Sequence, residues 1–178
     1  HPTFDVEPYA ADEPDVNARA ELDTANRLAA RNALTRSLPH YINAIKAAPT
    51  RYPSAHFNLA SVYEGKQEWA KAMFHYQAYV ALGSDGQTKE EARTGVERNR
   101  KRIWHADERI ATLKVDVQPE ARSKIYVNGF LFAQNQDLEE LQVMPDTFRV
   151  RAEAVDHIPQ TEEVELGKGE DQTVELEL

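Results

Sequence analysis

Hydrophobic and polar positions follow two different periods along the chain, and the change comes near residue 110. From about Asp15 to Ile110, apolar residues recur at the spacing of amphipathic helices, with breaks at residues 48–54, around Gly65 and at residues 83–88. This pattern predicts four or five helices joined by short turns. After Ile110, apolar and polar residues alternate, which is typical of strands with one buried face.

Five alternating segments follow the helical part. They cover residues 112–117, 124–129, 147–155, 162–167 and 172–178. Turn-forming residues separate them at Pro119-Glu120, Asn128-Gly129, Pro145-Asp146 and residues 167–169. Residues 111–178 are therefore predicted to be a small all-β domain. The predicted fold class is α+β, with the helices first and the strands after them.

Residues 1–14 are rich in proline and acidic residues and have no apolar period. This composition predicts that residues 1–14 form a disordered acidic leader. The predicted helical domain therefore covers residues 15–110. The chain begins at His1 rather than Met. We therefore expect an upstream segment, such as a tag, a signal peptide or a lipid-anchored leader.

Charge is distributed unevenly over these parts. Residues 24–110 carry 14 basic and 8 acidic side chains, residues 111–178 carry 6 and 15, and the net charge of the chain is −9. This acidity argues against nucleic acid as a partner. The absence of cysteine excludes disulfides, thiolate nucleophiles and cysteine-based zinc sites. No apolar run approaches the roughly 18 residues that a membrane span needs.

An internal repeat underlies the helical part. An offset of 35 residues aligns Ala25 with Ala60 and Gly95, and Ser37 with Ala72, so that small residues recur at the same positions. Bulky residues match in the same way: Leu28 with Tyr63, Tyr41 with Tyr76, and Ile45 with Val80. Two packed helices require this arrangement, because a side chain larger than alanine would push their axes apart where they cross. We predict Ala60 and Ala72 as crossing points.

The second of these units resembles the tetratricopeptide repeat. The matching residues are Leu59, Ala60, Tyr63, Trp69, Ala72, Tyr76 and Tyr79, and the unit before them ends with Tyr41, Ala44 and Pro49 at that family's spacing. The resemblance implies a concave groove, formed by the first helix of each pair, that binds another polypeptide. The family's groove positions fall on Phe57, Asn58, Ser61 and Glu64, with Arg93 equivalent to Asn58.

Two interpretations of these groove positions stay open. In the first, the amide of Asn58 and the guanidinium of Arg93 clamp a peptide backbone or a carboxylate, and Phe57 supplies apolar contact. In the second, so short a stack of helices has little groove, and Phe57 packs against a neighbouring helix or the β domain.

A helix from about Lys89 to Ile110 is expected to cap the repeats and to lead directly into the first strand. Its apolar stripe would consist of Ala92, Val96, Ile103, Ala106 and Ile110. Its polar face carries a basic run, Arg98, Arg100, Lys101 and Arg102. Solvation of the polar face explains this run, and the alternative is an anionic protein partner or an acidic part of this chain.

The C-terminal part resembles the PEGA domain, a small bacterial β-module. Residues 119–129 look like the segment that gives the family its name, followed by a strand and a turn. Residues 144–178 follow the later order of proline turn, strand, turn and two closing strands. The resemblance implies a β-sandwich. Helical repeats followed by such a domain resemble an arrangement of bacterial envelope proteins, which implies a periplasmic or otherwise extracytoplasmic location.

Residue patterns that carry enzyme chemistry are sparse. The chain has no glycine-rich phosphate loop, no His-Glu-x-x-His and no Gly-x-Ser-x-Gly. His56 and His75 fall on the two predicted helices of one repeat, where they could approach each other, but a metal site would need a further ligand. We therefore expect no enzyme activity, no cofactor and no metal site.

These observations predict a non-enzymatic adaptor or scaffold of the bacterial cell envelope, which binds a protein or peptide partner through the groove of the helical repeats. The alternative is a module that binds cell-wall glycan or another envelope polymer through the β domain. Exposed aromatic side chains would favour the alternative, because sugar rings stack on them. The candidates are Tyr126, Phe130 and Phe132.

Overall fold

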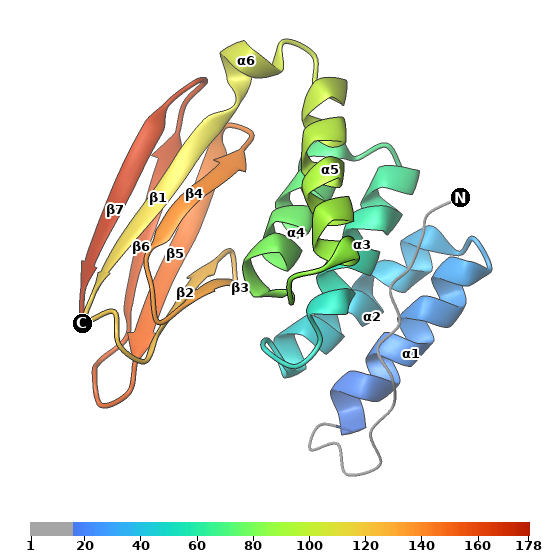
Figure 1. Ribbon diagram of the computed structural model, residues 1–178, viewed down its shortest axis with the longest axis horizontal. Coiled ribbons are helices and arrows are strands. Elements are labelled where there is room, and N and C mark those ends of the chain that lie inside the picture. The colour runs from blue at the N-terminus through green and yellow to red at the C-terminus, as the bar shows by residue number, and fades with distance from the viewer. Residues whose placement is uncertain (1–15) are drawn as a thin grey trace. The chain divides into compact units, whose positions relative to one another are not determined.

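The computed structural model describes residues 16–178, and the predicted acidic leader, residues 1–14, lies outside the described residues. The chain forms two compact units that divide between Arg100 and Lys101. In the described part, helices come first and strands in two sheets follow (Figure 1). The fold class is therefore α+β, as the sequence predicts.

The helical unit is built from consecutive helices joined by short turns. They are α1 (Val16–Ala30), α2 (Leu34–Ala47), α3 (Pro53–Gly65), α4 (Trp69–Leu82) and α5 (Gln87–Arg102). α1 packs against α2, α2 against α3, and α3 against α4. Pro53 is the first residue of α3, where its missing N–H has no intrahelical partner to lose. The predicted breaks after α2, α3 and α4 are confirmed.

The small residues of the internal repeat are buried where the helices pack. Ala25, Ala60 and Ala72 are 0% exposed, and so is Ser37. Gly95, the third residue of the alanine series, is also buried. Their burial agrees with the prediction that the repeat keeps small side chains at close helix contacts.

The prediction of a single long helix from Lys89 to Ile110 is wrong. α5 ends at Arg102, and a single turn, α6 (Ala106–Arg109), follows it. The residue before α6, His105, has a φ of +52°, in the left-handed region, which a right-handed helix cannot continue through. Of the predicted apolar stripe, Ala92 is buried, whereas Val96, Ile103, Ala106 and Ile110 are only half-buried. The other buried residues of α5 are Gly95 and Asn99.

The β unit consists of two sheets. The three-stranded sheet has the order β4-β1-β7, and the four-stranded sheet has the order β3-β2-β5-β6. The strands are β1 (Ala111–Gln118), β2 (Ser123–Val127), β3 (Phe130–Gln134), β4 (Leu138–Val143), β5 (Asp146–Ala154), β6 (Gln160–Leu166) and β7 (Asp171–Glu177). β1 pairs with β7 in parallel, and the other pairs are antiparallel. Alternate residues of both sheets are buried and form the core of this unit.

Two of these strands, β3 and β4, were not predicted. β3 has consecutive buried residues, Leu131, Phe132 and Ala133, and its pairing with β2 shifts in register. The pairing of β4 with β1 shifts as well, and the burial pattern of β4 does not alternate. Such irregularities interrupt the period of two from which strands are predicted. The predicted turn at Asn128-Gly129 is confirmed, since both residues have positive φ, as a two-residue type I′ hairpin requires.

Candidate functional site

α5 comes close to α4 at Gly95. A Cβ built on Gly95 would lie 2.8 Å from Cδ2 and Cε2 of the Tyr76 ring, which is nearer than real Cβ atoms approach other heavy atoms. Tyr76 is buried, with 2% of its surface exposed. Glycine therefore allows the backbone of α5 to approach this ring.

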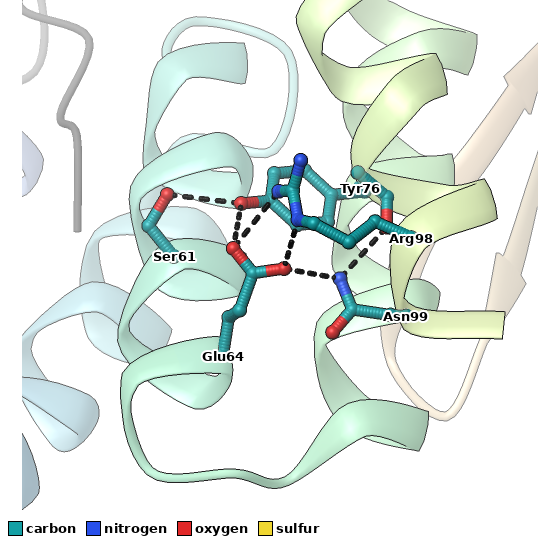
Figure 2. A network of polar contacts seen from close by, with 6 residues as sticks. Ser61, Glu64, Tyr76, Arg98 and Asn99 are labelled. Carbon is teal, nitrogen blue, oxygen red and sulfur yellow. Dashed lines mark hydrogen bonds and ion pairs between the residues drawn. The ribbon is translucent and has the colours of Figure 1, made fainter. Parts of the chain in front are cut away.

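Glu64 of α3 is the centre of a polar network that ties α5 to α3 (Figure 2). Arg98 donates from Nε to Oε2 of Glu64 at 2.8 Å and from Nη2 to Oε1 at 2.9 Å. Asn99 donates from Nδ2 to Oε2 at 2.6 Å. The hydroxyl of Tyr76 donates to Oε1 at 3.4 Å and lies 3.2 Å from Oγ of Ser61. The carboxylate thus receives donors from both α4 and α5, and the pairing with Arg98 is bidentate.

The protonation states of this network follow from its surroundings. Burial is the main cause that raises the pKa of Tyr76, so its hydroxyl stays neutral at physiological pH. The hydrogen bond with Glu64 is the main cause that raises the pKa of Arg98, so the guanidinium stays charged. The network therefore joins the helices through a neutral tyrosine hydroxyl and a charged guanidinium.

A groove of about 420 Å³ lies beside this network. Its lining residues are Phe57, Tyr76, Gln87, Glu90, Glu91, Thr94 and Arg98. Phe57 packs edge-on against Tyr76 and Tyr79, with ring centroids 5.4 and 5.6 Å apart. Aromatic rings from α3 and α4 thus meet polar and charged side chains from α5. The volume falls in the range of about 300–1,000 Å³ that is usual for ligand sites.

The structure brings only some of the predicted groove residues to this groove. Phe57 lines it, while Ser61 and Glu64 belong to the adjacent network. Asn58 is 0% exposed, and its Nδ2 donates to Oδ1 of Asn26 at 2.9 Å. Arg93 is exposed and pairs with Glu90. The predicted partners Asn58 and Arg93 therefore do not lie together on one exposed surface.

The four residues of the predicted basic patch have different surroundings. Arg98 is half-buried and bound to Glu64. Arg100 is also half-buried, whereas Lys101 and Arg102 are exposed at the end of α5. Arg98 thus belongs to the network described above rather than to a solvated cationic face.

His56 and His75 approach each other as the sequence suggested. Their Nδ1 atoms lie 3.1 Å apart, and the rings stack with centroids separated by 5.4 Å. The ring of His75 also stacks on Tyr63. Both histidines are buried, which lowers the pKa of His56 to about 3 and also lowers the pKa of His75. In residues 16–178, no group of three or more His, Cys, Asp or Glu side chains is placed to hold a metal ion.

The aromatic candidates for glycan contact in the β unit also differ from one another. Phe132 is a core residue with 1% exposure. Phe130 and Tyr126 are half-buried. The hydroxyl of Tyr126 donates to Glu153 at 3.1 Å, and the guanidinium carbon of Arg151 lies 5.7 Å from the ring centroid. Burial and the adjacent Glu153 raise the pKa of Tyr126 to about 12.

Apart from Arg98, the residues that α5 contributes to the site were not predicted from the sequence. They are Gln87, Glu90, Glu91, Thr94 and Asn99. The repeat contained a signal for one of them, because the offset that aligns Ala60 with Gly95 also aligns Glu64 with Asn99. These two equivalent positions are hydrogen-bonded to each other in the structure.

Comparisons with known proteins leave the family open: no family model matches the chain, and no curated protein sequence is similar to it. Among residues 16–178, none of the helices combines the length and the hydropathy that a membrane crossing demands.

Proposed function

We propose that this chain is a non-enzymatic adaptor that binds a segment of a partner polypeptide in the groove of its helical unit. The observation that carries the proposal is the groove of about 420 Å³, which is lined by the buried rings of Phe57 and Tyr76 and by exposed polar and charged side chains of α5. A concave site that combines apolar residues with a few polar groups is the usual composition of a ligand site.

The resemblance of the helical unit to the tetratricopeptide repeat supports this assignment. In that family the groove is formed by the first helix of each pair, and here the equivalent helices are α3 and α5. Both line the groove, α3 through Phe57 and α5 through residues such as Glu91 and Thr94. The proposal includes a PEGA-like β unit and an extracytoplasmic location, which are supported by the order of the two resemblances along the chain.

Affinity capture with a blocked groove tests the proposal. Thr94 is exposed on α5 and lines the groove, so Thr94→Trp should fill it without disturbing the core. Lys71→Trp places the same side chain at an exposed position of α4 outside the groove and serves as the matched control.

We expect that wild type and Lys71→Trp capture one and the same polypeptide from cells of the source organism and that Thr94→Trp does not. The purified partner should then show the same order of affinity in a direct titration. Equal binding of that partner to all three proteins, or capture of glycan alone, would contradict the proposal.

A further inference from the structure

The side chains around the groove carry an excess of negative charge. Glu90 and Glu91 line it from the N-terminal part of α5, and the side chain of Glu90 is 69% exposed. Glu91 is exposed and accepts a hydrogen bond at 3.1 Å from the neutral amide of Gln87 rather than from a cation. These two carboxylates are therefore the charged groups that an incoming segment meets first.

The arginines near the groove are already bound to carboxylates. Arg98 lines the groove, but both of its donating groups that point toward α3 are used by Glu64. Arg93 lies beside the groove and pairs with Glu90. An acidic ligand would have to displace Glu64 from Arg98 or Glu90 from Arg93, and either exchange would break an existing ion pair.

The charged groups in and beside the groove sum to a net negative charge. Three carboxylates, Glu64, Glu90 and Glu91, stand against two guanidinium groups, Arg93 and Arg98. One negative charge remains uncompensated, and it lies on the exposed side, at Glu91. Opposite charge on a ligand would be attracted to this side and like charge repelled.

The aromatic rings add little exposed apolar surface for a ligand. Phe57 and Tyr76 contact each other edge to face, with an angle of 73° between their planes, and only 4% and 2% of their surfaces are exposed. The exposed charged side chains of α5 therefore set the preference of the groove.

From these observations we infer that the groove selects peptide segments that carry a lysine or arginine. The inference rests on the proposed function and adds the chemistry of the partner. The inferred ligand is positively charged, whereas Asn58 and Arg93 led us to expect a carboxylate. That expectation does not apply here, because Asn58 is buried and Arg93 is paired with Glu90.

Three capped peptides of the sequence Gly-Ser-X-Phe-X-Ser-Gly, with X as lysine, glutamine or glutamate, test the inference on the full chain. Binding is followed by NMR chemical-shift titration. The lysine peptide should bind about fivefold more tightly than the glutamine peptide, and the glutamate peptide more weakly still, since exposed ion pairs contribute up to about 1 kcal/mol each. Added salt should reduce the preference.

Charge variants locate the preference. Glu90→Gln/Glu91→Gln should abolish it, whereas Asp23→Asn/Glu97→Gln, which removes two exposed carboxylates outside the groove lining, should retain it. Thr94→Trp should weaken the binding of all three peptides.

The results of these titrations distinguish failure of the inference from failure of the proposed function. Binding that Thr94→Trp weakens but that shows no charge preference, or a preference for glutamate, would overturn the inference and leave the groove as the binding site. Binding that Thr94→Trp does not affect, or no binding of any peptide up to millimolar concentration, would overturn both the inference and the proposed function.

Discussion

Gly95 sets how closely α5 can approach the buried ring of Tyr76. The Gly95→Ala variant would place a methyl group 2.8 Å from two ring atoms. Overpacking of this kind costs about 1–3 kcal/mol, and the better helix propensity of alanine offsets at most about 1 kcal/mol. We expect a net loss of about 1–2 kcal/mol in the free energy of unfolding, measured by urea denaturation and far-UV circular dichroism.

A control on the same helix separates crowding from helix propensity. Glu97 is exposed on α5, and Glu97→Ala should leave the unfolding midpoint nearly unchanged. If Gly95→Ala were as stable as Glu97→Ala, the ring of Tyr76 would not be held where we describe it.

Glu64 carries the bidentate ion pair with Arg98 and also accepts hydrogen bonds from Asn99 and Tyr76. Glu64→Gln keeps the shape of the side chain but removes its charge, which leaves the half-buried guanidinium of Arg98 without a counter-ion. Because the pair is partly exposed, with 38% of the Arg98 side chain accessible, we expect a loss of about 1–2 kcal/mol rather than the larger cost of a fully buried pair.

The matched control removes an exposed ion pair. Asp85 is 95% exposed and pairs with Lys89 one turn along α5. Asp85→Asn should leave the free energy of unfolding nearly unchanged, because exposed ion pairs contribute little. Equal losses for Glu64→Gln and Asp85→Asn in urea denaturation would mean that the network does not stabilise the packing of α5.

Among single residues, the repeat pattern predicted the small buried positions better than it predicted which side chains hydrogen-bond or form ion pairs. Ala60 and Ala72 are buried as predicted, because small residues at helix crossings leave a periodic signal. The contacts of Asn58 and Arg93 left no such signal, since they depend on which neighbours, Asn26 and Glu90, lie within reach.

At the scale of elements, the buried His56–His75 pair links the stability of the α3–α4 hairpin to pH. One Nδ1 must carry a proton and the other must accept it, so the folded pair is neutral. Burial lowers the pKa of both imidazoles, and the charges of the neighbouring histidine and of Lys71 lower that of His75 further. The unfolded chain, with ordinary histidine pKa values near 6.5, binds protons that the folded hairpin does not.

The direction of the pH effect follows from these pKa values. The free energy of unfolding should fall as the pH drops below about 6.5, by about 1.4 kcal/mol per pH unit for each histidine, and His56 should stop contributing near pH 3. Urea denaturation between pH 7 and pH 4.5 measures this slope.

A variant with two non-titrating side chains isolates the contribution of the pair. His56→Asn/His75→Gln should lose stability at pH 7 but show a shallower slope below pH 6.5. The same slope in wild type and variant would assign the acid sensitivity to carboxylates elsewhere.

Helices and strands were predicted from the sequence where one hydrophobic period continued, and they were missed where that period was interrupted. Regular alternation predicted β1, β5 and β7, whereas the register shifts that β1 and β2 make against their partners concealed β4 and β3. The end of α5 was missed because neither glycine nor proline marks it; His105 adopts the left-handed conformation instead. Gly95 and Asn99 are buried on this helix together with Ala92. Because glycine and asparagine are not apolar side chains, a search for an apolar stripe could not predict these two positions.

At the scale of the whole molecule, the segment between α5 and α6 is the expected site of proteolytic cleavage. Trp104 is 77% exposed there, and both compact units retain their own buried cores. Limited digestion with chymotrypsin should cut first after Trp104 and leave a helical and a β fragment, identified by mass spectrometry. Trp104→Ser should slow this first cut. Initial cleavage within α1 to α5 or within the strands β1 to β7 would contradict the division into a helical and a β unit.

The central claim is that the groove beside the Glu64 network is the surface that holds a partner polypeptide, and in-cell photo-crosslinking tests it most directly. A photoreactive phenylalanine analogue replaces Thr94 in the groove or, as the control, Lys71 outside it. We predict that the probe at position 94 crosslinks to one polypeptide, at a segment that carries a lysine or arginine, and that the probe at position 71 does not. The same crosslinks from both positions, or none from position 94 in cells that express the protein normally, would contradict it.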